Sequence, residues 1–129
     1  VRREGKDISI ITYGAMVYTA LEAAERLEQD GIDAEVIDLR TLQPFDREAI
    51  VESVRKTSKA IILHEATRTG GMAGEITAVI NEEAFEYLDG PVMRVTAIDT
   101  PVPYSPPLEE FFLPQVDDVL KAARSLAAY

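Results

Sequence analysis

The residues best suited to take part in a chemical reaction are His64 and Glu65, where a predicted strand ends. They follow the apolar run Ala60–Leu63, which is the predicted strand, and we call His64–Glu65 the corner. His64 is the only histidine in the chain. A histidine beside an acid at the end of a strand could act as a general base. Neighbouring residues on a strand point to opposite faces, however, so the two side chains are not expected to pair, and one histidine does not make a metal site. The favoured interpretation is therefore a hydrogen-bonded histidine at a domain or subunit contact.

A glycine-rich turn follows this corner, between Gly70 and Gly74. Backbone N–H groups at the start of a helix can bind phosphate. The stretch lacks the Lys-Ser/Thr pair of a phosphate loop, and its spacing does not fit the dinucleotide fingerprint. We expect the small residues to let the next helix pack closely on the sheet instead. No serine lies in the sequence context of a hydrolase nucleophile.

Charged residues in the loops offer two further candidate sites. Arg40 and Arg68 follow two different predicted strands and could converge where an anion binds, or serve as salt-bridge partners at an interface. Acidic residues gather at Glu86 and Asp89, and again at Glu109–Glu110. We expect them either to be solvated or to form a docking patch for a basic partner. Taken alone, these residues form no complete catalytic set, which is typical of one domain of a multidomain enzyme.

Alternating strands and helices must position these residues. Apolar, β-branched runs predict strands at Ile8–Tyr13, Ala34–Asp38, Ala60–Leu63 and Val92–Thr96. Apolar spacing of three and four predicts helices from Val17 to Leu27, from Asp46 to Thr57, from Met72 to Tyr87, and after Pro114. This order predicts a doubly wound α/β domain with a mostly parallel sheet and helices on both faces. Val1–Gly5 is a candidate antiparallel strand, and the proline-rich stretch Ile98–Pro107 is expected to be an extended loop.

The bulk composition limits the classes of protein that fit. The 129 residues match one domain, and 47% apolar residues indicate a globular chain. The formal net charge of −10 argues against nucleic acid as a partner and favours a basic protein. The lack of cysteine excludes disulfides, and neither a membrane-spanning run nor a signal peptide is visible. Because the chain begins at Val1 without methionine, we interpret it as a fragment of a longer protein.

Three stretches of the chain carry a family resemblance: EVIDLRTLQPFD, HEATRTGG and DTPVPYSPPLE, in this order. Together they resemble the carboxyl-terminal domain of the beta subunit of thiamine-diphosphate-dependent 2-oxo acid dehydrogenases, and the likeness runs from Gly5 to Tyr129. The His-Glu-Ala form of the corner is more similar to branched-chain-type beta subunits than to pyruvate-type ones.

This resemblance implies a fold and a reaction. The fold is that of the transketolase carboxyl-terminal domain, a three-layer α/β/α unit with a five-stranded, mostly parallel sheet and one antiparallel strand. The complete enzyme would decarboxylate a 2-oxo acid oxidatively and acylate a lipoyl group. Thiamine diphosphate and magnesium would bind between the alpha subunit and another part of the beta subunit. The resemblance thus implies no catalytic, cofactor-binding or metal-binding residue in residues 1–129.

The resemblance also implies partners for this domain. They are the alpha subunit and a second beta subunit in an α2β2 assembly, and the basic peripheral-subunit-binding domain of dihydrolipoyl acyltransferase. Asp89 and Tyr129 are the expected docking residues for that domain. The expected interface residues are His64, Glu65, Arg68 and Arg40. The compartment would be the bacterial cytoplasm, or the mitochondrial matrix in a eukaryote.

Besides a free-standing scaffold protein built on this fold, two alternatives stay open at this point. One is a non-catalytic, flavodoxin-like nucleotide-binding module, although the chain lacks both an acidic cluster at the strand ends and a Ser/Thr-rich flavin loop. The other is the same domain in a different thiamine-diphosphate enzyme, such as transketolase. The DTPVPYSPPLE stretch argues against that second alternative.

Overall fold

A computed structural model describes residues 2–39, 47–67, 73–97 and 114–128. Four strands form one sheet in the order β2-β1-β3-β4, and each neighbouring pair is parallel. The strands are β1 (Ile8–Thr12), β2 (Ala34–Asp38), β3 (Ala60–Thr67) and β4 (Met93–Ala97). The helices are α1 (Met16–Gln29), α2 (Arg47–Thr57), α3 (Ala73–Glu83) and α5 (Val116–Ala127), with a short 3-10 helix η1 (Phe85–Tyr87). The predicted α/β class is confirmed.

Strand β1 occupies an inner position between β2 and β3. All five of its residues are buried, because its apolar side chains point alternately toward the helices on the two faces. The register sets Ile10 opposite Val36 on β2 and Ile61 on β3. Since the strands are parallel, the residues that follow β1 and β3 leave the sheet at the same carboxyl edge.

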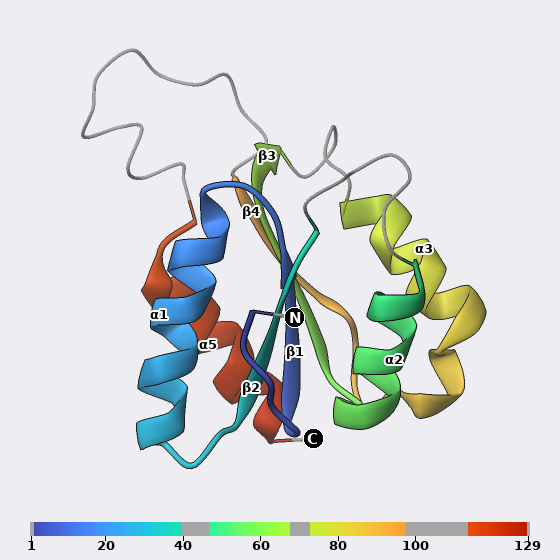
Figure 1. Ribbon diagram of the computed structural model, residues 1–129, viewed down its shortest axis with the longest axis horizontal. Helices are drawn as coiled ribbons and strands as arrows, with labels where there is room; N and C mark the ends of the chain where they lie inside the picture. The colour runs from blue at the N-terminus through green and yellow to red at the C-terminus, as the bar shows by residue number, and fades with distance from the viewer. Residues whose placement is uncertain (1, 40–46, 68–72, 98–113, 129) are drawn as a thin grey trace.

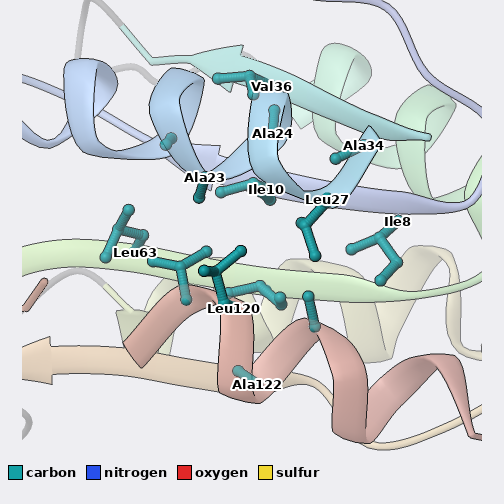
Figure 2. Close-up of a cluster of buried hydrophobic side chains, with 14 of the residues drawn as sticks. Ile8, Ile10, Ala23, Ala24, Leu27, Ala34, Val36, Leu63, Leu120 and Ala122 are labelled. Atoms are coloured by element: carbon teal, nitrogen blue, oxygen red, sulfur yellow. The ribbon is translucent and has the colours of Figure 1, made fainter. Parts of the chain in front are cut away.

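The helices cover both faces of the sheet, as predicted (Figure 1). Helices α1 and α5 lie together on one face, where they enclose the first core (Figure 2). Alanines at the centre of α1, among them Ala20, Ala23 and Ala24, are completely buried, and such small side chains let the helix lie close to the strands. Gly31, with φ +80°, follows the end of α1 in the left-handed conformation that glycine adopts readily.

Helices α2 and α3 form the second core on the opposite face. Ile50 and Val54 of α2 and Ile76 and Ile80 of α3 are completely or almost completely buried. They pack with strand residues such as Ile62. The apolar spacing in both helices therefore identified the side chains that meet the sheet.

The boundaries of two elements differ from the prediction. The helix expected to run to Tyr87 ends at Glu83, where Ala84 leaves the helical region (φ −135°, ψ 10°) and η1 follows. The next large apolar side chain, Phe85, is exposed, so packing against the core does not stabilise a further turn of α3. Strand β3 continues past Leu63 to Thr67, which pairs with Ala97 on β4.

The amino-terminal segment forms less β-structure than expected. Its antiparallel pairing consists of one isolated bridge between Arg3 and Val36, at the outer edge of β2. In the described ranges the sheet has four strands, so a fifth strand is not established. The proline-rich stretch at residues 98–107 falls outside those ranges. Among the helices that the structure describes, none is long and apolar enough to cross a membrane.

Candidate functional site

His64 lies in β3 directly after Leu63, and its side chain is completely buried. Its ring stacks on that of Tyr13, the residue after β1, with 5.8 Å between the ring centroids and 20° between the planes. Neither Nδ1 nor Nε2 has a hydrogen-bond partner among the described residues. The hydrogen bonds expected at this histidine are therefore not supplied by that part of the chain.

The surroundings of His64 favour its neutral form. Burial lowers the pKa of the imidazole below its ordinary value, and the positive charge of Arg94 lowers it further. A general base must reach the proton that it removes. Complete burial separates His64 from molecules at the surface, so the geometry fits a packed side chain at the carboxyl edge better than an acid–base catalyst.

A second buried polar atom lies at the same edge. Thr12 Oγ1, at the end of β1, also lacks a hydrogen-bond partner in the described ranges. Thr12 pairs in register with Leu63, the residue before His64. Because side chains alternate along a strand, Thr12 and His64 face opposite sides of the sheet and do not form one cluster.

The other predicted interface residues are only partly described. Glu65 lies within β3, and the structure describes its backbone alone. Arg40, Arg68 and the predicted docking residue Tyr129 lie outside the described residues. The convergence of the two arginines, and the role of Tyr129, therefore stay predictions.

In the glycine-rich turn, the structure describes Gly74 and the backbone of Ala73. Gly74 lies in the first turn of α3 and is exposed. A Cβ atom added there would meet no atom of the described residues within 4 Å. The expectation that small residues bring this helix close to the sheet is therefore wrong at Gly74.

Asp89 lies in an exposed turn after η1. Its N–H donates to the carbonyl oxygen of Ser58 (2.8 Å), which ties the turn to the end of α2. Phe85 is 68% exposed nearby in the sequence, and Glu86 is also exposed. We call Phe85, Glu86 and Asp89 the η1 surface. An exposed aromatic residue within four positions of two exposed acidic residues suits contact with a basic, partly apolar partner.

A cluster of buried polar residues near the amino ends of β1 and β2 was not predicted. The carboxylate of Glu35, only 2% exposed, accepts hydrogen bonds from Ser53 Oγ (2.6 Å) and from Lys56. Ser53 Oγ is also 2.5 Å from Ser9 Oγ, which lies 2.6 Å from Thr57 Oγ1. The one signal in the sequence was an acid inside an apolar strand. Its partners come from another element, so local spacing could not identify them.

In the described part of the chain, no three His, Cys, Asp or Glu side chains are placed to hold a metal ion. Glu35 is already engaged by Lys56 and Ser53.

The parallel sheet with helices on both faces places the protein among the doubly wound α/β domains. The family model described as "Transketolase, C-terminal domain" matches residues 1–119. The chain therefore belongs to the transketolase C-terminal domain family.

Curated relatives in this family are beta subunits of 2-oxo acid dehydrogenases. The chain is 50% identical over 129 residues to the pyruvate dehydrogenase E1 component subunit beta of Bacillus subtilis (strain 168). It is 47% identical over 130 residues to the 2-oxoisovalerate dehydrogenase subunit beta of the same organism. These matches cover all of this chain but 39% and 40% of the relatives, so the chain spans about two-fifths of their length. The expected resemblance to such subunits is confirmed, and the two similar identities do not favour one 2-oxo acid.

Solved structures agree with the fold. The structure entitled "Split gene transketolase, inactive beta4 tetramer" matches 99% of this chain and 40% of its own, with a TM-score of 0.85 and 35% sequence identity. A 2-oxoglutarate:ferredoxin oxidoreductase from Magnetococcus marinus matches with a TM-score of 0.64 at 17% identity, which shows the fold alone.

Proposed function

We propose that this chain is the carboxyl-terminal domain of a 2-oxo acid dehydrogenase beta subunit and serves assembly and docking there. The observation that carries the proposal is the 47–50% identity to such subunits along the whole chain. In the complete complex, a 2-oxo acid is decarboxylated oxidatively and a lipoyl group is acylated.

Catalysis is assigned to the rest of the enzyme. The chain's only histidine is completely buried and neutral, and the buried carboxylate of Glu35 is engaged by Lys56. Thiamine diphosphate and magnesium accordingly bind to the complete enzyme, outside this domain. The cofactor supplies the decarboxylation chemistry, and this domain contributes to the arrangement of the subunits that hold it.

The proposed partners are an alpha subunit, a second beta subunit in an α2β2 assembly, and the peripheral-subunit-binding domain of dihydrolipoyl acyltransferase. The net charge of −10 complements a basic partner. The η1 surface, which contains the predicted docking residue Asp89, is the described region that best suits it. His64 can support an interface only indirectly, because its ring is buried beneath the surface. We propose the bacterial cytoplasm, or the mitochondrial matrix in a eukaryote, as the compartment.

The alternatives have less support. A flavodoxin-like nucleotide-binding module does not account for the family match along residues 1–119. Transketolase belongs to the same family, but the matched split-gene transketolase is 35% identical to this chain, whereas the first two dehydrogenase relatives are 50% and 47% identical.

The division of labour can be tested by calorimetry with thiamine diphosphate and magnesium. We expect the α2β2 enzyme to bind the cofactor and to decarboxylate pyruvate or a branched-chain 2-oxo acid. We expect the 129-residue chain, once circular dichroism shows that it is folded, to give no binding heat and no turnover. Micromolar binding by that chain alone would overturn the proposal, as would an assembled enzyme without activity on any 2-oxo acid.

A further inference from the structure

The segment Arg2–Gly5, which we call the strap, lies along the outer edge of β2. An edge strand has backbone groups with no neighbouring strand to pair with. Here the N–H groups of Arg2 and Arg3 approach the carbonyl oxygen of Val36 at 2.9 and 3.4 Å, and the Val36 N–H donates to the Arg3 carbonyl at 2.8 Å. The strap therefore occupies part of the edge that β2 leaves open.

Gly5 allows the strap to approach the strand closely. A Cβ atom at this position would lie 2.4 Å from the carbonyl carbon of Ala34 and 2.5 Å from the Glu35 nitrogen. Both atoms belong to backbone inside the sheet, so they cannot move aside cheaply. Any larger residue at position 5 would have to lift the strap away from β2.

The Glu35 carboxylate connects Gly5 of the strap to helix α2. Its Oε1 accepts a hydrogen bond from the Gly5 N–H (3.3 Å) and another from Lys56, while Oε2 accepts one from Ser53 (2.6 Å). A carboxylate that is 2% exposed is costly unless charge and hydrogen bonds compensate it. The same carboxylate therefore holds both the strap and the end of α2.

Arginine side chains of the strap add contacts along β2. The Arg3 guanidinium donates to the Ala34 carbonyl (2.5 Å) and lies 3.2 Å from the Glu28 carboxylate. Arg2 lies 3.6 Å from the Asp38 carboxylate. Partly exposed ion pairs such as these contribute little to stability, and the antiparallel pairing of Arg3 with Val36 gives the direction of the strap. Gly5 lies beside the start of β2, and Arg2 lies beside its end.

We propose that Glu35, Lys56 and Gly5 form a latch that holds the strap on β2 and thereby fixes the direction from which the preceding domain joins this one. The inference rests on the proposed function, in which this chain follows another domain of a longer beta subunit. Because the strap runs antiparallel to β2, the preceding chain arrives from the carboxyl-edge side of the sheet. The latch thus orients two domains through one buried carboxylate.

Limited trypsin digestion of the full-length subunit tests the latch, because the strap contains Arg2 and Arg3. We expect slow cleavage there in the wild type and at least about ten-fold faster cleavage in Gly5→Ala, since proteolysis follows the population of the opened segment. The matched control is Gly74→Ala, where the added Cβ meets no atom of the described residues within 4 Å. Mass spectrometry identifies the fragments that begin at Arg3 or Glu4.

A second pair of variants tests the carboxylate. Glu35→Ala should accelerate the same cleavage, whereas Glu52→Ala, at a glutamate whose side chain is 65% exposed, should not. If Glu35→Ala unfolds the domain, the cleavage rate of the Gly5→Ala subunit alone tests the latch. Rapid cleavage of the strap in the wild type, or wild-type rates in a folded Gly5→Ala subunit, would overturn the latch. The digestion needs no partner subunit, so its failure would leave the assembly proposal intact.

Discussion

Two buried titratable residues, His64 and Glu35, are accommodated in different ways. Glu35 keeps its charge partner Lys56 within hydrogen-bond reach. That carboxylate also raises the pKa of Lys56, chiefly through their hydrogen bond, so the ammonium group stays charged. His64 has no such partner among the described residues and is accommodated by losing its charge.

The sign of the pH dependence of stability follows from the lowered pKa of His64. Below about pH 6.5, the ordinary histidine pKa, the unfolded chain takes up a proton that the folded chain resists. Stability is therefore fully present above that pH and falls as the pH drops toward the folded-state pKa. His64→Phe should remove this part of the loss, which the unfolded-state pKa limits to at most about 1.4 kcal/mol between pH 7.5 and 5.5. Urea unfolding of both proteins at the two pH values measures it.

The comparison between variant and wild type is essential here, because carboxylates also begin to titrate near pH 5. Their contribution is shared by both proteins and cancels in the difference. Equal losses of stability in the wild type and in His64→Phe would show that His64 does not resist protonation in the folded state.

At the scale of elements, α5 completes the first core. Its residues Val119, Ala123 and Leu126 are completely buried, and the helix packs against α1 as well as the sheet. Asp118 Oδ2 accepts the Gln115 N–H at 2.8 Å and so helps to begin the helix. The last helix in the sequence is thus structurally joined to the first.

Truncation of Leu126 should destabilise the domain strongly. Leu126→Ala removes a completely buried side chain and leaves a cavity between α5 and the strands. The expected loss is about 2–5 kcal/mol in the free energy of unfolding. The neighbouring Ser125→Ala, at an exposed position of the same helix, should change it by less than about 0.5 kcal/mol. Chemical denaturation measures both, and similar small changes would show that α5 is dispensable to the core.

Local periodicity predicted these elements well, because it reports which side chains face the sheet. The apolar spacing after Pro114 predicts one face with Val116, Val119, Leu120 and Ala123; the last three are buried, and Val116 is partly buried against the same core. The end of α3 before Ala84 was not predictable in this way, since it depends on where the side chains stop packing against the sheet. The Glu35–Lys56 pair joins residues 21 positions apart on a strand and a helix. Spacing within one element carries no information about such a contact.

The whole molecule presents different chemistry at its two ends. At the carboxyl edge of the sheet, buried polar atoms of Thr12 and His64 have no hydrogen-bond partner among the described residues, whereas the amino ends of β1 and β2 hold the hydrogen-bonded cluster around Glu35. The η1 surface adds exposed acidic and aromatic groups to a chain of net charge −10. Under the proposed function, this surface would recognise the basic partner, and the cofactor would bind to other parts of the enzyme.

The measurement that tests this account most directly is calorimetric binding of the peripheral-subunit-binding domain to the α2β2 enzyme. Reversing the charge in Asp89→Lys should weaken binding at least about ten-fold, because it places a cation against a basic partner. The control Asp117→Lys, at an aspartate whose side chain is 89% exposed, should bind like the wild type. Decarboxylation assayed with an artificial electron acceptor should be unchanged in both variants. Unchanged affinity in Asp89→Lys, or loss of decarboxylation with normal assembly, would contradict the account.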